Sequence, residues 1–395
     1  MADQTEQSSS PAPSDRRVIS SSDFPVPLVE VAELAQTNGR SSNRRRFLAE
    51  ASALATFLAG CVRSKPASEK SDTTTTSGLG PPSHLNQNPD SRSDTSLRHG
   101  MPATSSTPGA MGGGNVPFQR FDPALPPVSA TRTTKLHFTA REVPLRVRDD
   151  TVVAAWTFEG NIPGPIVHVR QGDTVEFTLT NAGHVPHSMD FHASQLDPKV
   201  AFRSVLPGQS LSFTYKPKYS GAFLYHCGTA PVLMHMGSGM FGAIIVDPLT
   251  PLRKAKEFVL VQNEFYLGPA QNGVHPFDYN KMLETLPDLF AFNGRPGQYQ
   301  TEPIRVKRGD RVRFYVVTAG PTVPCAFHVV GEQFDTVYLG SPPANAIHGV
   351  QTFSVPAGGG MIFEMEAEIP GEFVFVNHAF GHGQKGAIGL LIVEE

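Results

Sequence analysis

Four side chains of metal-binding type follow one another in the middle of the chain. They are His187, Cys227, His235 and Met240, within the segments HSMDFH and YHCGTAPVLMHMGSGM. Two imidazoles, a thiolate and a thioether form the ligand set of a blue-copper electron-transfer site. The alternative is a buried cysteine with unrelated histidine and methionine neighbours, but four ligand types in this order favour a copper site of the type 1 kind.

A second set of polar residues alternates with the first. Successive side chains on a strand point to opposite faces, so His226 and Cys227 face opposite sides. His187 and His192 also have opposite parity, and Asp190 shares the parity of His192. If the first site holds Cys227 and His187, the other three lie together behind it. This parity predicts a second metal site with two imidazoles and an acid, joined to the first by one peptide link that can carry an electron.

Short apolar runs separated by Gly, Pro and Asp dominate from about residue 131 onward, which is typical of β-sandwiches. The expected strands of the first half are Val152–Phe158, Ile166–Val169, Thr174–Leu179, Leu211–Tyr215, Ala222–Tyr225 and Ala243–Val246. The one expected helix is short and covers Asp278–Leu289.

The pattern then repeats in the second half of the chain. Three ordered blocks correspond: 165–183 with 303–320, 205–225 with 355–375, and 241–248 with 385–395. We therefore predict an all-β fold of two tandem cupredoxin-like Greek-key β-sandwich domains, at about 116–249 and 250–395.

The second repeat lacks a blue-copper set. In the sequence alignment of the repeats, His328 falls opposite His192, and Cys325 falls near the place of His187. No Cys-His-Met set follows in 376–395. We interpret Cys325 as a small buried residue rather than a ligand.

The start of the chain has the pattern of an export signal. The segment SSNRRRFLAEASALATFLAGC (41–61) resembles a twin-arginine signal that ends in a lipobox. Its apolar part is too short to span a bilayer. We predict an export signal at 1–61 with Cys61 as the lipidated residue, cleavage without a lipid being the alternative. Residues 62–115 are rich in Ser, Thr, Pro and Gly and predict a disordered tether. The expected location is the periplasm or the outer envelope face, with contact to the membrane only through the lipid.

Charge and cysteine content exclude other classes. The formal net charge is -3, which gives no electrostatic case for nucleic-acid binding. Three cysteines are too few and too scattered for a disulfide framework.

Together these segments resemble the copper-containing nitrite reductases of the multicopper oxidase superfamily, across residues 130–395. The resemblance implies one type 1 and one type 2 copper per subunit, with electrons entering at the type 1 copper and nitrite reduced to nitric oxide at the type 2 copper. It also implies a homotrimer in which the last type 2 histidine comes from the neighbouring subunit, and a cupredoxin or c-type cytochrome as electron donor. The implied type 1 ligands are His187, Cys227, His235 and Met240. The implied type 2 ligands are His192, His226 and His378.

The same resemblance assigns the residues around the second copper. Asp190 and His328 match the active-site acid and base, Val330 lies where a bulky aliphatic residue shapes the pocket, and Thr352 helps to hold His328. His382, in FGHGQKG, either lines the substrate channel or is a solvated loop residue.

Three other functions compete with nitrite reduction. A laccase-type oxidase needs several His-x-His pairs, and the sequence has none. A simple electron carrier needs only the type 1 ligands and does not account for the second set. The same two sites acting on another small substrate is the third possibility.

Overall fold

The computed structural model describes residues 115–395. The predicted export signal at 1–61, its lipidation residue Cys61 and the tether up to residue 114 lie outside the described residues. Within residues 115–395, no helix combines the length and the apolar character needed to cross a membrane.

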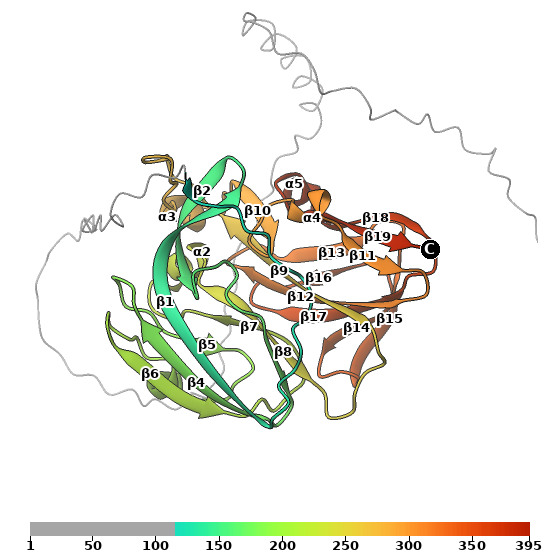
Figure 1. The fold of residues 1–395 in the computed structure, drawn as a ribbon, viewed down its shortest axis with the longest axis horizontal. Coiled ribbons are helices and arrows are strands. Elements are labelled where there is room, and N and C mark those ends of the chain that lie inside the picture. Colours follow the sequence, from blue (N-terminus) through green and yellow to red (C-terminus); the bar gives the residue numbers. More distant parts are fainter. Residues whose placement is uncertain (1–114) are drawn as a thin grey trace, which may run out of the picture. The chain divides into compact units, whose positions relative to one another are not determined.

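Two four-stranded sheets form the first sandwich (Figure 1). One sheet has the order β2 (Thr151–Phe158), β1 (Thr133–Arg148), β4 (Thr174–Asn181) and β6 (Ser210–Tyr215). The other has the order β3 (Val167–Arg170), β8 (Phe241–Asp247), β7 (Gly221–His226) and β5 (Asp190–Phe191). A core rich in aromatic rings, including Phe177, Phe191 and Tyr225, fills the space between them.

The second sandwich is larger. Its first sheet runs β10 (Leu289–Phe292), β9 (Lys256–Phe265), β12 (Arg311–Gly320), β17 (Gly360–Glu366), β14 (Phe334–Gly340) and β15 (Asn345–Val350). Its second sheet runs β11 (Ile304–Lys307), β19 (Ile388–Glu394), β18 (Gly371–Asn377), β13 (Cys325–Val329) and β16 (Thr352–Val355). The all-β prediction and the two-sandwich prediction are confirmed.

Helices among residues 115–395 are short. They are α1 (Pro198–Ala201), α2 (Val232–Gly237), α3 (Tyr279–Leu283), α4 (Gln298–Thr301) and α5 (Phe380–Gln384). The helix expected at 278–289 is real but ends early. Asp278 caps its start, whereas Thr285 adopts a positive φ of 55° and Pro287 cannot donate a helical hydrogen bond.

The expected strands of the first half are observed with shifts of one or two residues at their ends. The longest strand among residues 115–395, β1, was not among them. Its sequence TTKLHFTAREVPLRVR has charged residues and a proline, yet it pairs with β2 on one side and β4 on the other. Tertiary pairing therefore decides its structure where the local pattern is weak.

The repeat is confirmed by strand connectivity. In the first sandwich β1 is parallel to β4, β3 is parallel to β8, and β7 is antiparallel to β8. In the second, β9 is parallel to β12, β11 is parallel to β19, and β18 is antiparallel to β19. Both sandwiches also place a short helix after the strand that precedes the last one, α2 after β7 and α5 after β18.

Strand register corrects the last block of the sequence alignment. Gly242 lies opposite Tyr225, and Gly389 lies opposite Phe375. A Cβ at either glycine would fall on that ring, at 2.3 Å from Tyr225 and 2.2 Å from Phe375. Gly242 therefore corresponds to Gly389, three positions beyond the match read from the sequence, because the short GAI motif occurs in both copies in a different register.

Register also corrects the partner of His328. Asp190 lies opposite His226 on β7, and His328 lies opposite Val376 at the equivalent place on β18. His328 is thus the counterpart of Asp190, and Val330 is the counterpart of His192. The alignment that paired Phe191-His192 with Phe327-His328 was wrong because the Phe-His pair occurs in both copies in a different register, two positions apart.

The two sandwiches share an apolar interface. Leu224 and Ile245 of the first pack with Val261, Val317 and other residues of the six-stranded sheet. The segment before β1, which the sequence placed with the first domain, also reaches the second sandwich, because Ala124 bridges to a residue of β9.

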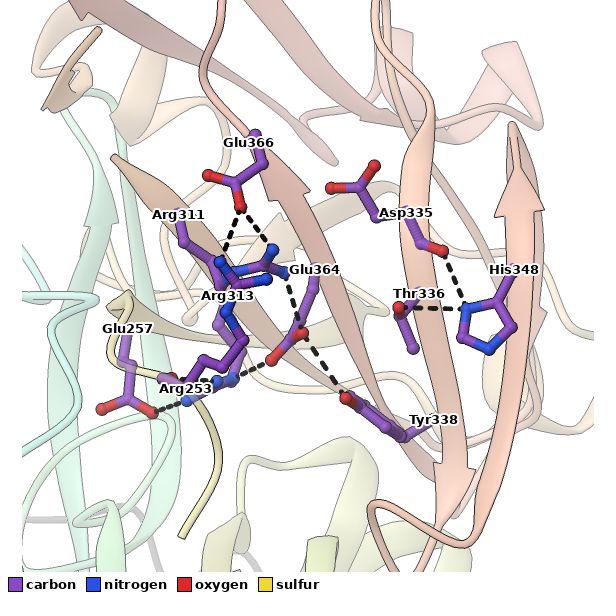
Figure 2. Close-up of polar contacts among 10 residues, drawn as sticks. All are labelled: Arg253, Glu257, Arg311, Arg313, Asp335, Thr336, Tyr338, His348, Glu364 and Glu366. Atoms are coloured by element: carbon purple, nitrogen blue, oxygen red, sulfur yellow. Dashed lines mark hydrogen bonds and ion pairs between the residues drawn. The ribbon is translucent and has the colours of Figure 1, made fainter. Parts of the chain in front are cut away.

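A buried ionic network lies on the six-stranded sheet (Figure 2). Arg313 Nε is 2.5 Å from Glu364 Oε1, and its Nη1 is 2.6 Å from Glu257 Oε1. Arg311 pairs with Glu364 and Glu366 beside it. Each buried charge thus has an opposite charge as its partner, which limits the cost of its desolvation.

Candidate metal centres

The first centre lies at one end of the first sandwich. His187 precedes β5, Cys227 follows β7, and His235 lies on α2; their ligand atoms are all within 4.8 Å of one another and all three residues are buried. Met240 directly precedes β8 and is fully buried. Its backbone N–H donates to the His235 carbonyl at 3.1 Å, and its carbonyl accepts from Cys227 N–H at 3.0 Å. The fold therefore gathers the four residues that the sequence picked out.

The donor set of this centre suits a soft metal ion. Both ring nitrogens of His187 are buried without a hydrogen-bond partner, although Nε2 lies 3.5 Å from Glu142 Oε1. Burial raises the pKa of the Cys227 thiol, but contacts with His187 and with backbone N–H groups outweigh it, so the pKa lies below its usual range. An unpartnered imidazole beside a thiol that ionises readily is what thiolate–imidazole copper binding requires.

The second centre is on the other side of the Cys227 peptide. Asp190 on β5, His226 at the end of β7 and His192 have ligand atoms within 4.8 Å of one another. The Nε2 atoms of His192 and His226 are 3.1 Å apart, and Asp190 Oδ2 is 4.0 Å from His226 Nε2. The structure places these three residues as strand alternation predicts.

Backbone carbonyls fix the tautomers of the two imidazoles. His192 Nδ1 is 3.0 Å from the Gly358 carbonyl, and His226 Nδ1 is 2.9 Å from the Cys227 carbonyl. Each Nδ1 must donate to its carbonyl, so in the neutral rings both Nε2 lone pairs face each other. Two lone pairs at 3.1 Å repel unless a cation lies against them. The pair therefore fits a metal ion held by neutral imidazoles.

The remaining predicted residues form a separate group in the second sandwich. The His328 and His378 ring centroids are 5.1 Å apart, and Phe380 packs on His378 with centroids 4.5 Å apart. Among residues 115–395 of one chain, neither histidine joins a metal-type cluster with His192 and His226. The fold of a single chain thus brings together two of the three predicted type 2 histidines.

The residue that holds His328 differs from the one expected from the sequence, which was Thr352. His328 Nδ1 is 2.6 Å from the Gln351 carbonyl, which holds the ring, while Thr352 is the neighbour of His328 across the β13–β16 pair. Val330 is 46% exposed at the end of β13, which leaves it free to shape a surface pocket. Cys325 is fully buried in the core, as predicted.

His382 is neither a solvated loop residue nor shown to line a channel. It lies on α5, is half-buried and stacks on Phe290 with centroids 4.2 Å apart. Its Nδ1 is 3.2 Å from Asn377 Nδ2. The loop interpretation was wrong because α5 is too short to show a helical pattern in the sequence.

Two residues beside the first centre were missed in the sequence. Trp156 on β2 packs edge-to-face with the rings of His187 and His235, with centroids 5.8 and 4.9 Å apart. Glu142 on β1 lies beside His187. Burial raises the pKa of Glu142, but its contact with His187 and the hydrogen bonds from His184 lower that pKa to about 2. Neither lies near the ligand motifs in sequence, and β1 itself was not recognised.

Comparisons with known proteins agree with this architecture. Residues 140–251 and residues 269–395 each match a family model described as multicopper oxidase. The chain is 39% identical over 262 residues to a copper-containing nitrite reductase of Neisseria meningitidis serogroup A, covering 64% of this chain and 67% of the relative.

Solved structures show the same likeness. Copper nitrite reductase from Nitrosomonas europaea superposes with a TM-score of 0.63 at 34% identity, over 67% of this chain and 94% of that one. The copper-containing nitrite reductase from Thermus scotoductus superposes with a TM-score of 0.61 at 28% identity, over 66% of this chain and 62% of that one.

Two cupredoxin-like sandwiches with a buried Cys-His-His group in the first define a copper protein of the multicopper oxidase class. Within that class, the chain belongs to the copper-containing nitrite reductases.

Proposed function

We propose that this chain reduces nitrite to nitric oxide, consuming one electron and two protons and releasing water. The observation that carries the proposal is the direct linkage of Cys227 and His226, which belong to the two metal-type groups. Copper in the first group would serve as type 1 electron-entry site and copper in the second as type 2 nitrite-binding site. The peptide between the two residues gives the electron a short covalent route.

Asp190 and His328 supply the protons in this proposal. The Asp190 carboxyl lies beside the facing Nε2 atoms of His192 and His226, and its side chain is 32% exposed, so it can both reach nitrite and exchange protons with water. His328 is fixed by the Gln351 carbonyl on one nitrogen, which leaves the other for a water-mediated transfer.

We propose that the second centre is completed between subunits of a homotrimer. Three histidine ligands leave an open position for substrate, as catalytic metal sites require. One chain brings together only His192 and His226 in its described part, while His378 lies exposed beside His328. A neighbouring subunit that presents these two residues would supply both the third ligand and the base.

Export, anchoring and the electron donor remain parts of the proposal. The twin-arginine pattern and the lipobox support a periplasmic or outer-envelope protein held by lipid on Cys61. A small cupredoxin or c-type cytochrome is the proposed donor. Replacing Cys61 with Ser should release the protein from membranes, as measured by fractionation.

The proposal is tested by nitric oxide release from the copper-loaded protein with nitrite and a reduced dye, beside a metal count and an EPR spectrum. We expect about two coppers per chain, type 1 and type 2 signals, and rapid release of nitric oxide. Both signals without nitric oxide would mean another substrate, and a type 1 signal alone would mean an electron carrier.

Asp190→Asn tests the proton donor. We expect both copper signals to remain and nitrite turnover to fall by about 100-fold or more, because general acid catalysis contributes on the order of 10²–10⁴. Asp149→Asn, in the turn between β1 and β2, is the matched control and should retain full turnover. Normal turnover of Asp190→Asn would remove this carboxyl from the mechanism.

A further inference from the structure

Glu142 is a buried acid behind the first centre. Its side chain is 9% exposed, and it extends from β1 toward the segment that carries His184 and His187. Both carboxylate oxygens accept from the His184 backbone N–H, at 3.0 and 3.1 Å, and Oε2 is 3.1 Å from the His184 ring. These bonds hold the carboxylate in one position.

The missing side chain of Gly183 leaves room for this carboxylate. A Cβ at Gly183 would lie 2.8 Å from both carboxylate oxygens of Glu142. Any residue other than glycine at position 183 would push the acid out of place. Glycine at position 183 is therefore needed for the carboxylate of Glu142 to approach His187.

The held carboxylate faces the ring of His187. Its Oε1 is 3.5 Å from Nε2, while Nδ1, the other ring nitrogen, is buried without a partner. Histidine ligands usually give their second N–H to a carboxylate or carbonyl, which fixes the tautomer and makes the ligating nitrogen more basic. The same division of roles fits the two nitrogens of His187.

We propose that Glu142, held by His184 and admitted by Gly183, is a positioning residue that orients His187 and strengthens it as a copper ligand. This inference rests on copper binding at the first centre. A more basic ligand stabilises the oxidised, more highly charged ion, so Glu142 also lowers the reduction potential of that centre.

The second sandwich provides an internal control. Pairing of β1 with β4 and of β9 with β12 places Glu264 at the position equivalent to Glu142. Glu264 is also buried, and it accepts from the backbone N–H of Val323 at 2.5 Å and of Thr322 at 3.2 Å. No histidine contact is found for Glu264 in the described part of the chain. The carboxylate therefore belongs to the shared scaffold, and only the first sandwich adds a histidine to it.

The experiment compares Glu142→Gln, Gly183→Ala and Glu264→Gln in the full-length, copper-loaded protein. The readouts are the reduction potential of the type 1 copper by spectroelectrochemical titration, its visible and EPR spectra, and copper retention against a chelator. The type 2 EPR signal and the thermal midpoint report whether each variant folds.

We expect Glu142→Gln and Gly183→Ala to raise the potential and to weaken copper retention at the first centre by about 10- to 100-fold. Glu264→Gln should leave the potential and the spectra unchanged. Unchanged potential and retention in a folded Glu142→Gln variant would overturn the inference, as would an equal shift in Glu264→Gln. Absence of a type 1 signal from the unaltered protein would instead refute the proposed copper site itself.

Discussion

Each sandwich has two backbone N–H groups at equivalent positions, and a different side chain accepts hydrogen bonds from them in each. In the first, Cys227 accepts from the backbone N–H of Ser188, at 3.3 Å, and of Thr229. In the second, the Oδ1 of Asn377 accepts from the N–H of Ala326 at 3.2 Å and of Ala379 at 3.1 Å. Strand register makes these equivalent positions, so an amide stands where the first sandwich has its thiol.

The other positions of the first centre have changed as well. His187 corresponds to Cys325, and Met240 corresponds to Ala387. His235 corresponds to His382, since Met240 N–H donates to the His235 carbonyl at 3.1 Å and Ala387 N–H donates to the His382 carbonyl at 3.1 Å. The shared backbone shows that the loop geometry comes from the fold, whereas metal binding depends on the side chains placed on it.

The opposite face of the same strands also carries different side chains in the two sandwiches. Asp190 and His328, the proposed acid and base, occupy equivalent positions in the two sandwiches. His192 is replaced by Val330, whose N–H bonds to β18 as that of His192 bonds to β7. One position on a repeated strand therefore carries a carboxyl side chain in one copy and an imidazole in the other.

The largest expected effect comes from giving His192 the side chain of its counterpart in the second sandwich, Val330. His192→Val should remove the type 2 signal, lower the copper count from about two to about one per chain, and reduce nitric oxide release to background. The type 1 signal should persist, because its ligands face the other side of the strand. EPR and metal analysis measure both, with the exposed strand residue His137→Val as control. Retention of type 2 copper would show that the three-histidine assignment is wrong.

A smaller effect is expected from Asn377→Ala. Removing the amide leaves two backbone donors and the Oε1 of Gln262, 2.7 Å from Asn377 Nδ2, without partners. We expect the free energy of unfolding to fall by about 2–4 kcal/mol, as for buried groups left unsatisfied. Thermal and denaturant unfolding measure the change, and the exposed Asn345→Ala should stay within about 0.5 kcal/mol of the original. A similarly small change for Asn377→Ala would mean that water replaces the amide.

The sequence predicts the ligands of the first centre because they stand in two short motifs, one leading into β5 and one running from the end of β7 through α2 to the start of β8. It also predicts the back-to-back arrangement of Cys227 and His226, since alternation along a strand is a local property. It does not predict Glu142, whose strand is defined by pairing with two distant strands. The match of His328 with His192 failed for a similar reason, because register depends on strand pairing and a Phe-His pair occurs in both copies at different register positions.

The smallest expected effect is on the pH dependence of stability and comes from Glu264, the counterpart of Glu142. Burial raises the pKa of Glu264, and hydrogen bonds from Tyr266 and the Val323 backbone offset this only in part. Below the ordinary value of 4.5 the carboxyl is protonated whether or not the chain is folded. As the pH rises above 4.5, the unfolded chain releases the proton first, so stability falls until the folded pKa is passed.

Glu264→Gln should remove this fall. Thermal midpoints of the copper-free protein, measured from about pH 4 to about pH 8, should show the original protein losing stability relative to Glu264→Gln as the pH rises. The exposed Glu372→Gln on β18 should follow the original protein throughout. Parallel curves for Glu264→Gln and the original would mean that the hydrogen bonds offset burial fully. In that case both equivalent acids would have hydrogen bonds strong enough to offset their burial.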